Sequence, residues 1–190
     1  MIAATFQDKL IVVQLLVDSF NANKSINYIV KQDSKRTERI KALMEYSFDV
    51  CLKHGSVFLS EKKDACALIL FPDKKKPTLR TFIKDINIVI NVSGLSAIPR
   101  ILNREKKIKA NYPNEPFLYL WFICVSPKQQ GLGLGKHLLG EIINIAQRYK
   151  QRIYLETSMV ENLIFYKNLG FEVYKEIDFG YRLYLLRKSI

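Results

Sequence analysis

The chain has 190 residues, three cysteines and a formal net charge of +12. With 48% hydrophobic and 25% charged residues, its composition is that of one globular domain with a sizeable core, which excludes a disordered or fibrous chain. The odd number of cysteines, without metal-type spacing, argues against a disulfide framework and a zinc site. We expect buried thiols in a reducing compartment, and therefore a cytoplasmic protein.

Helical patterns dominate the first third of the chain. Apolar residues recur with a helical period over about 6–21, over 26–31, and over 34–53, where Gly55 ends the pattern. The apolar run 10–17 is too short to span a bilayer, and no basic region precedes it as in a signal peptide. We therefore predict amphipathic helices here, with no membrane partner.

A hairpin and a second helical region come next. Residues 56–60 and 65–71 have strand composition and are joined by a polar turn. Residues 79–90 and 95–110 return to a helical period. We interpret 73–116 as a helical insertion and link that precedes the core strand.

The central stretch of the chain covers residues 117–149. The apolar run 117–125 predicts a strand buried on both faces. A turn over 126–130 leads to a helix that opens with three alternating glycines: Gly131, Gly133 and Gly135. Glycines let backbone N–H groups turn towards a ligand, and a helix start adds unpaired donors and a partial positive charge. This layout predicts a site for a phosphate or pyrophosphate.

Two well-known phosphate loops fit this segment less well. A P-loop needs a Ser or Thr after its lysine to hold magnesium, but His137 follows Lys136 here. A Rossmann loop needs its glycines directly at the strand end, whereas residues 126–130 intervene. Glu156, at the end of the next strand, stands where a ribose-binding acid is expected. A Rossmann-type nucleotide enzyme therefore remains as an alternative.

The C-terminal part alternates strand, helix and hairpin. Residues 152–157 predict a strand, and the capping-box pattern over 158–161 predicts the start of a helix that stops at Gly170. Residues 171–177 and 181–186 predict a final hairpin. The mixed order of elements indicates an α/β protein with a mixed sheet.

Two segments resemble the GNAT acyltransferases, the Gcn5-related N-acetyltransferases. Residues 130–135, QGLGLG, fit the family's Q/R-x-x-G-x-G/A loop, and residues 162–171, NLIFYKNLGF, are similar to its N-x-x-x-Y-x-x-x-G-F helix end. The resemblance is clear from about residue 117 to the C-terminus. It implies an α/β fold with a GNAT-like mixed β-sheet flanked by helices and a helical insertion before the core strand, in a single domain over 1–190.

The reaction that the resemblance implies is transfer of an acetyl group from acetyl-CoA to a primary amine of a small molecule or peptide. The backbone of residues 123–125 would pair with the amides of the pantetheine arm as an added strand does, and an N–H there could polarise the thioester carbonyl. The expected cofactor-binding residues are Ile123, Cys124, Val125, Gln130, Gly131, Leu132, Gly133, Leu134, Gly135, Lys136 and Asn162.

Two residues are candidates for proton transfer. Tyr166 is the candidate acid for the leaving thiolate, because a phenol with a pKa of about 10 is protonated at neutral pH; it could instead only anchor its helix. Glu156 is the candidate base, directly or through water, although a structural acceptor role is equally open, and Glu115 is another possible base. No cluster of His, Asp and Cys suggests a metal site.

The charge of +12 raises the question of a nucleic-acid partner. The lysines are scattered, and no stacking aromatics are interleaved with them. We expect a solvated basic surface, suited to a polyanionic cofactor, and no nucleic-acid partner. The alternative function is a non-catalytic module that binds coenzyme A or nucleic acid; salt-sensitive nucleic-acid binding would indicate the latter.

Overall fold

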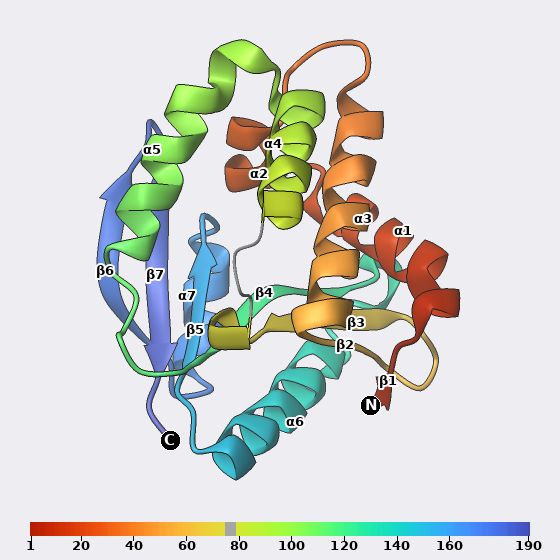
Figure 1. Ribbon diagram of the computed structural model, residues 1–190. Helices are drawn as coiled ribbons and strands as arrows, with labels where there is room; N and C mark the ends of the chain where they lie inside the picture. The colour runs from red at the N-terminus through yellow and green to blue at the C-terminus, as the bar shows by residue number, and fades with distance from the viewer. Residues whose placement is uncertain (75–78) are drawn as a thin grey trace.

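The computed structural model of the chain describes residues 1–74 and 79–190, with the side chains of 1–74 and 86–190. Within these residues, seven strands form one mixed sheet in the order β1-β2-β3-β4-β5-β7-β6 (Figure 1). All neighbouring strands are antiparallel except β4 and β5, which are parallel. The strands are β1 Ile2–Ala3, β2 Gly55–Leu59, β3 Ala65–Leu70, β4 Leu118–Val125, β5 Ile153–Thr157, β6 Glu172–Asp178 and β7 Arg182–Lys188.

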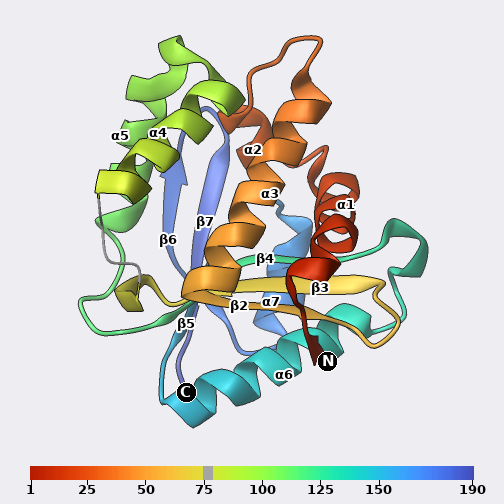
Figure 2. The same ribbon diagram turned by 45° about the vertical axis from the view of Figure 1, so that its right-hand side comes forward.

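Helices cover both faces of the sheet. The first five lie on one face, and α6 and α7 lie on the other (Figures 1 and 2). The helices are α1 Lys9–Phe20, α2 Lys24–Ile29, α3 Arg36–His54, α4 Leu79–Ser93, α5 Ile98–Lys109, α6 Leu134–Tyr149 and α7 Glu161–Lys167. The predicted mixed sheet with flanking helices, and with helices before the core strand, is confirmed. Among the described residues, no single helix is long and apolar enough to cross a bilayer.

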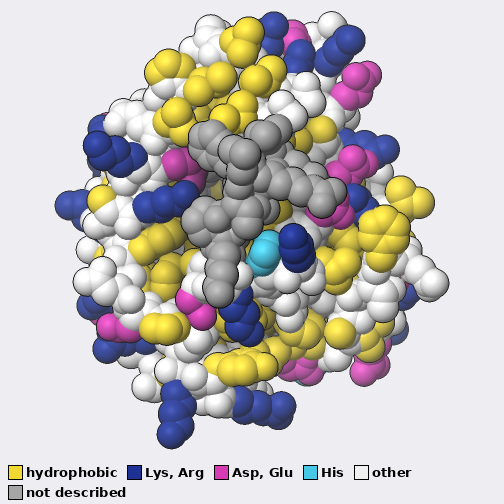
Figure 3. Space-filling model, viewed as in Figure 1, with side chains coloured by type: hydrophobic (Ala, Val, Ile, Leu, Met, Phe, Trp, Pro, Cys, Tyr) yellow, Lys and Arg dark blue, Asp and Glu magenta, His cyan; other side chains and the backbone are white. Residues whose placement is uncertain are grey.

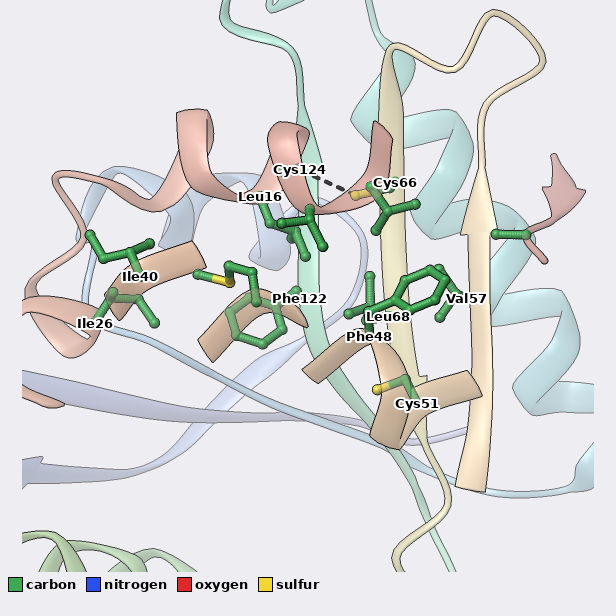
Figure 4. Close-up of a cluster of buried hydrophobic side chains, with 14 of the residues drawn as sticks. Leu16, Ile26, Ile40, Phe48, Cys51, Val57, Cys66, Leu68, Phe122 and Cys124 are labelled. Atoms are coloured by element: carbon green, nitrogen blue, oxygen red, sulfur yellow. Dashed lines mark hydrogen bonds between the residues drawn. The ribbon is translucent and has the colours of Figure 1, made fainter. Parts of the chain in front are cut away.

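Each face of the sheet has its own apolar core. On the first face, side chains of α1 and α3 such as Leu16, Met44 and Phe48 are fully buried against β2, β3 and β4 (Figure 4). On the second face, the α6 stripe that includes Leu139 and Ile142 packs against the same sheet. Burial of each such side chain contributes roughly 1.5–3 kcal/mol to the stability of the fold. The apolar residues that recur with a helical period in the sequence are therefore the ones that hold the helices on the sheet.

Strand β4 differs from the prediction of a strand buried on both faces. Its side chains alternate between buried and half-buried from Leu118 to Val125. Strand β4 also contains a bulge at Trp121. Leu68 of β3 pairs with Phe122, but the next residue of β3 pairs with Leu120, so Trp121 is an extra residue in β4. The extra residue reverses which face of the sheet the side chains after it occupy. As a result, Leu120 belongs to the core under α6, and Phe122 belongs to the core under α1 and α3.

Two local features also depart from the sequence analysis. The two-residue strand β1, which pairs with β2, was not predicted, since two residues carry no periodicity. The predicted capping box over 158–161 is wrong: α7 begins at Glu161, and no side chain caps it. The Ser158 hydroxyl instead accepts a hydrogen bond from the Ser25 backbone N–H at 3.3 Å, so a tertiary contact with α2 replaces the local cap.

Candidate active site

Strands β4 and β5 pair only where they begin. Their register contains Leu118 with Ile153 and Tyr119 with Tyr154, and no further pair. Beyond Tyr119 the two strands separate, while β5 remains paired with β7 as far as Thr157. We call the opening between residues 120–125 and 155–157 the β4–β5 wedge. Among the described residues no strand pairs with the β4 edge of this wedge, so its backbone groups face the opening.

The glycine loop lies at the open end of the wedge, after β4 and a short 3-10 turn over Pro127–Gln129. Gly131 and Gly133 have φ angles of 82° and 78°, in the left-handed region that glycine adopts without strain. A Cβ added to either residue would meet nothing within 4 Å, so the backbone conformation alone requires glycine there. Gly133 is the N-cap of α6 and has no side chain to cap the first N–H groups of the helix. Those donors suit a phosphate group.

Gly135 has a different role from the other two glycines. It already lies inside α6, and a Cβ there would be 3.5 Å from Val125 Cγ2 and 3.7 Å from Phe165 Cζ, which is ordinary contact. The steric need for this glycine is therefore weaker than the sequence pattern indicates. The same distances show that α7, through Phe165, packs against the start of α6 and the end of β4.

Tyr166 is placed by that packing. Its side chain is 6% exposed, and its ring contacts Phe165 and Phe171 at centroid distances of 5.2 and 5.6 Å. Burial raises the pKa of the Tyr166 phenol, so the hydroxyl keeps its proton at neutral pH. Asn162 lies one turn earlier on α7 and is exposed. The helix ends at Lys167, earlier than predicted, and Gly170 follows it with a left-handed φ of 80°.

Glu156 lies on the other face of the sheet from Tyr166. Its neighbour Leu155 packs into the core under α6 and α7, so the alternation along β5 turns Glu156 towards α5. The Tyr112 hydroxyl donates a hydrogen bond of 2.8 Å to Glu156 Oε1. Burial raises the pKa of Glu156, while the positive charge of Arg104 and the bond from Tyr112 oppose this rise. The two candidates for proton transfer, Tyr166 on α7 and Glu156 on β5, therefore lie on opposite faces of the sheet.

The remaining predicted ligand residues follow β4 in order. Ile123, Cys124 and Val125 form the end of the open β4 edge. Gln130 Nε2 donates to the Val125 carbonyl at 3.3 Å and holds the turn against the strand. Leu132 is 69% exposed at the tip of the loop, and Lys136 is exposed in the first turn of α6 together with the partly buried Leu134. The structure therefore brings the strand edge and the loop residues to one place.

Other candidates lie elsewhere. Glu115 forms an ion pair of 2.8 Å with Arg152, at the opposite end of β5 from Glu156. Both line a cavity of about 640 Å³ that contains none of the residues of the β4–β5 wedge. His137 is exposed on α6 and lies 3.4 Å from Glu141. Among the described residues, no group of three or more His, Cys, Asp or Glu could hold a metal ion.

The partners of Glu156 were not predicted from the sequence. Arg104 is buried between Ile101 and Ile108 on the inner stripe of α5, and Tyr112 comes from the link after that helix. An arginine on the apolar face of a helix was the available signal, because a buried guanidinium needs several acceptors. On the face that Figure 3 shows, Lys and Arg side chains are spread among acidic, polar and hydrophobic ones.

Comparison with known proteins agrees with this geometry. Residues 100–173 match the family model of the acetyltransferase (GNAT) domain. The crystal structure of a histone acetyltransferase HPA2 and related acetyltransferase from Corynebacterium glutamicum matches 99% of this chain and 94% of that chain, with a TM-score of 0.74 and 20% identity. Arylalkylamine N-acetyltransferase 2 from Aedes aegypti matches 100% of this chain and 97% of that chain, with a TM-score of 0.66 and 16% identity.

A third structure has the same architecture. The C-terminal condensation domain of Ebony, solved in complex with β-alanyl-dopamine, matches 100% of this chain and 97% of that chain, with a TM-score of 0.73 and 12% identity. At these identities the likeness establishes the fold. The chain therefore has the GNAT acetyltransferase fold along its whole length and the sequence match of a GNAT domain over residues 100–173, which confirms the predicted resemblance.

Proposed function

We propose that the protein is an acetyl-CoA-dependent N-acetyltransferase that acts on a primary amine of a small molecule or peptide. One observation carries the proposal: the unpaired edge of β4 is followed, after one turn and the glycine loop, by the uncapped N-terminus of α6. Coenzyme A has a matching order of groups, with amides in its pantetheine arm and a pyrophosphate beyond them. A strand edge binds amides as an added strand does, and a helix start binds phosphates.

The loop and the strand edge would divide the binding of the acyl donor between them. Backbone N–H groups from Gly131 to Lys136 would hold the pyrophosphate, helped by the flanking left-handed glycines. Backbone groups of 123–125 would pair with the pantetheine amides, and Asn162 on α7 would bond the same arm. An N–H near Cys124 or Val125 would polarise the thioester carbonyl as charge develops on its oxygen.

The proton transfers would be shared between Tyr166 and Glu156. As the amine attacks the thioester carbonyl, a C–N bond forms and the C–S bond breaks. The Tyr166 hydroxyl, kept protonated by burial, would donate its proton to the departing sulfur. The Glu156 carboxylate would accept a proton from the amine, directly or through water. Donor and acceptor from opposite faces of the sheet would keep the two transfers apart.

The printed names of similar structures are consistent with an amine acceptor. One neighbour is an arylalkylamine N-acetyltransferase and another was solved with β-alanyl-dopamine. In this chain the acceptor side would be formed by the elements around Glu156, namely α2, α5 and the turn between β6 and β7. These elements would select the acceptor, since they lie on the α5 face of the sheet, where Glu156 is directed.

The direct test is calorimetric titration of the purified protein with acetyl-CoA, coenzyme A and NAD. We expect micromolar binding of acetyl-CoA and coenzyme A and no binding of NAD, followed by acetylation of at least one member of an amine panel. NAD preference would favour the Rossmann-type alternative. Salt-sensitive binding of RNA without affinity for acetyl-CoA would contradict the proposal and favour a nucleic-acid module.

A further inference from the structure

Arg104 is the centre of a buried polar cluster on the acceptor side of the sheet. Its side chain is 5% exposed. The guanidinium donates from Nε to the Tyr181 hydroxyl at 3.0 Å, from Nη2 to Ser25 Oγ at 2.7 Å and from Nη1 to Glu105 Oε1 at 2.8 Å. One side chain therefore ties α5 to α2 and to the turn before β7.

The cluster extends to Glu156 in two ways. Tyr112 donates its hydroxyl hydrogen to Glu156 Oε1 at 2.8 Å, and the charge of Arg104 favours the ionised form of the same carboxyl group. Both act against burial, which favours the protonated form. Three other described groups act on Glu156 or respond to it: Tyr119 on β4, whose hydrogen bond also lowers the pKa of Glu156, Glu105 on α5, whose charge raises it, and Tyr174 on β6.

These contacts address a difficulty in the proposed chemistry. A buried carboxyl group that remains protonated cannot accept a proton from an amine, so Glu156 needs influences that favour its ionised form. Tyr112 fixes one oxygen of Glu156, and Arg104 supplies the compensating charge without a direct bond that would compete with the amine. A general base must be ionised at the working pH and must still be basic enough to accept a proton. Burial favours the second condition, and Arg104 and Tyr112 favour the first.

We propose that Arg104 and Tyr112 are positioning residues that hold the Glu156 carboxylate ready to accept a proton from the acceptor amine. The inference rests on the acetyltransferase function proposed above and deepens it, because it gives two residues outside the GNAT-like motifs a role in positioning Glu156. In physical terms, Tyr112 orients the carboxylate, and the positive charge of Arg104 favours its ionised form. Neither residue transfers a proton itself.

Arg100 provides a matched control for Arg104. It lies one turn earlier on α5, stacks its guanidinium over the Tyr28 ring at 4.5 Å and donates to the Tyr28 carbonyl at 2.9 Å. It therefore helps to anchor α5 on α2, as Arg104 does. Arg100 makes no bond to Tyr181 or Ser25 and is not among the charges that act on Glu156. Arg100 is exposed and Arg104 is buried, so Arg100→Met controls for losing an arginine that joins α5 to α2, and Arg104→Lys controls for the charge.

The test is the pH dependence of kcat/KM for wild type, Arg104→Met, Arg104→Lys, Tyr112→Phe and Arg100→Met, with acetyl-CoA and an amine found in the acceptor panel. Arg104→Met and Tyr112→Phe each remove an influence that lowers the pKa of Glu156. That pKa therefore rises, and the acid limb of the profile should move to higher pH by about one unit, a tenfold loss on that limb. Arg104→Lys should restore much of the limb, and Arg100→Met should leave it in place.

The same measurements separate the two proposals. If wild type binds acetyl-CoA and acetylates an amine but the acid limb is the same in all variants, the positioning role is wrong and the acetyltransferase function stands. If wild type transfers no acetyl group to any amine, the function itself is wrong. Should Arg104→Met fail to fold because Tyr181, Ser25 and Glu105 lose their partner, Tyr112→Phe decides alone, since it removes a single oxygen atom.

Discussion

The Sγ atoms of Cys66 and Cys124 lie 3.4 Å apart in the core, on directly paired residues of β3 and β4 (Figure 4). Both side chains are buried. The hydrogen bond with Cys124, together with burial, raises the pKa of the Cys66 thiol, and either thiol can donate the hydrogen bond. Buried thiols were predicted from the sequence but their contact was not, because a separation along the chain says nothing about strand register.

This contact predicts that the pair can be oxidised to a disulfide. Directly opposed residues of antiparallel strands have Cα atoms within the range of about 4.4–6.8 Å that a disulfide needs. We expect diamide, a diazene oxidant, to remove two protons and two electrons from the pair, and mass spectrometry to show the loss of two hydrogen atoms. Cys51→Ser should retain this reaction and Cys66→Ser should abolish it. Retention in Cys66→Ser would show that another thiol is involved.

Local patterns explain how much of the fold could be predicted. The helix that became α3 was predicted because Ile40, Met44 and Phe48 recur on one stripe, and all three are fully buried. Short or tertiary features were missed for a physical reason. Strand β1 is too short for a period, and Ser158 matches a capping pattern but bonds to α2, because a partner far along the chain outcompeted the local one.

The same distinction applies to the candidate site. The glycine loop could be predicted, since Gly131 and Gly133 have positive φ angles that only glycine adopts without steric strain, and this requirement is local to the loop. The surroundings of Glu156 could not, because Arg104 and Tyr112 come from a different part of the chain and meet it only in the folded sheet. The extent of β4–β5 pairing is likewise a property of the whole sheet.

Replacement of Gly133 by valine should abolish binding of coenzyme A. The φ angle of 78° is unfavourable for a β-branched residue by about 1–2 kcal/mol or more, so the loop would leave the conformation that presents its N–H groups. Protein contacts would not cause the loss, because a Cβ at this position meets nothing within 4 Å. Calorimetry with acetyl-CoA measures the effect.

The matched control for that variant is Gly140→Val. Gly140 lies inside α6, and a Cβ there also meets nothing within 4 Å, but its backbone is helical. This control should bind acetyl-CoA with wild-type affinity and should not weaken the helix, because valine is a better helix former than glycine by a few tenths of a kcal/mol. Equal binding by Gly133→Val and wild type would refute the assignment of the loop to the pyrophosphate.

Asp8 should make stability depend on pH in the acid range. Its carboxylate accepts hydrogen bonds from Lys63 Nζ at 2.7 Å and from the Thr5 backbone N–H at 2.9 Å. These bonds, that from Lys63 first, lower the pKa of Asp8 from 3.8 to about 2. A folded-state pKa below the unfolded one means stabilisation that is complete above the unfolded pKa and lost as pH falls towards the folded one.

We therefore expect Asp8→Asn to be less stable than wild type at about pH 5 and closer to it at about pH 2. The urea midpoints of the two proteins at both pH values measure this. Lys63→Met should reduce the same pH dependence, because it removes the largest cause of the lowered pKa. A difference between wild type and Asp8→Asn that is independent of pH would assign the effect to packing or to the cap at Thr5.

Tyr166→Phe should lower kcat by about two orders of magnitude, the usual contribution of a positioned general acid, and leave the affinity for acetyl-CoA unchanged. Because burial raises the pKa of Tyr166 above its usual value, wild type should show no alkaline loss of activity from this group below about pH 10. Tyr184→Phe is the control, since Tyr184 is buried in the same core cluster. An unchanged kcat in Tyr166→Phe, or an equal fall in Tyr184→Phe, would return Tyr166 to a packing role, and the proton for the leaving thiolate would then have to come from water.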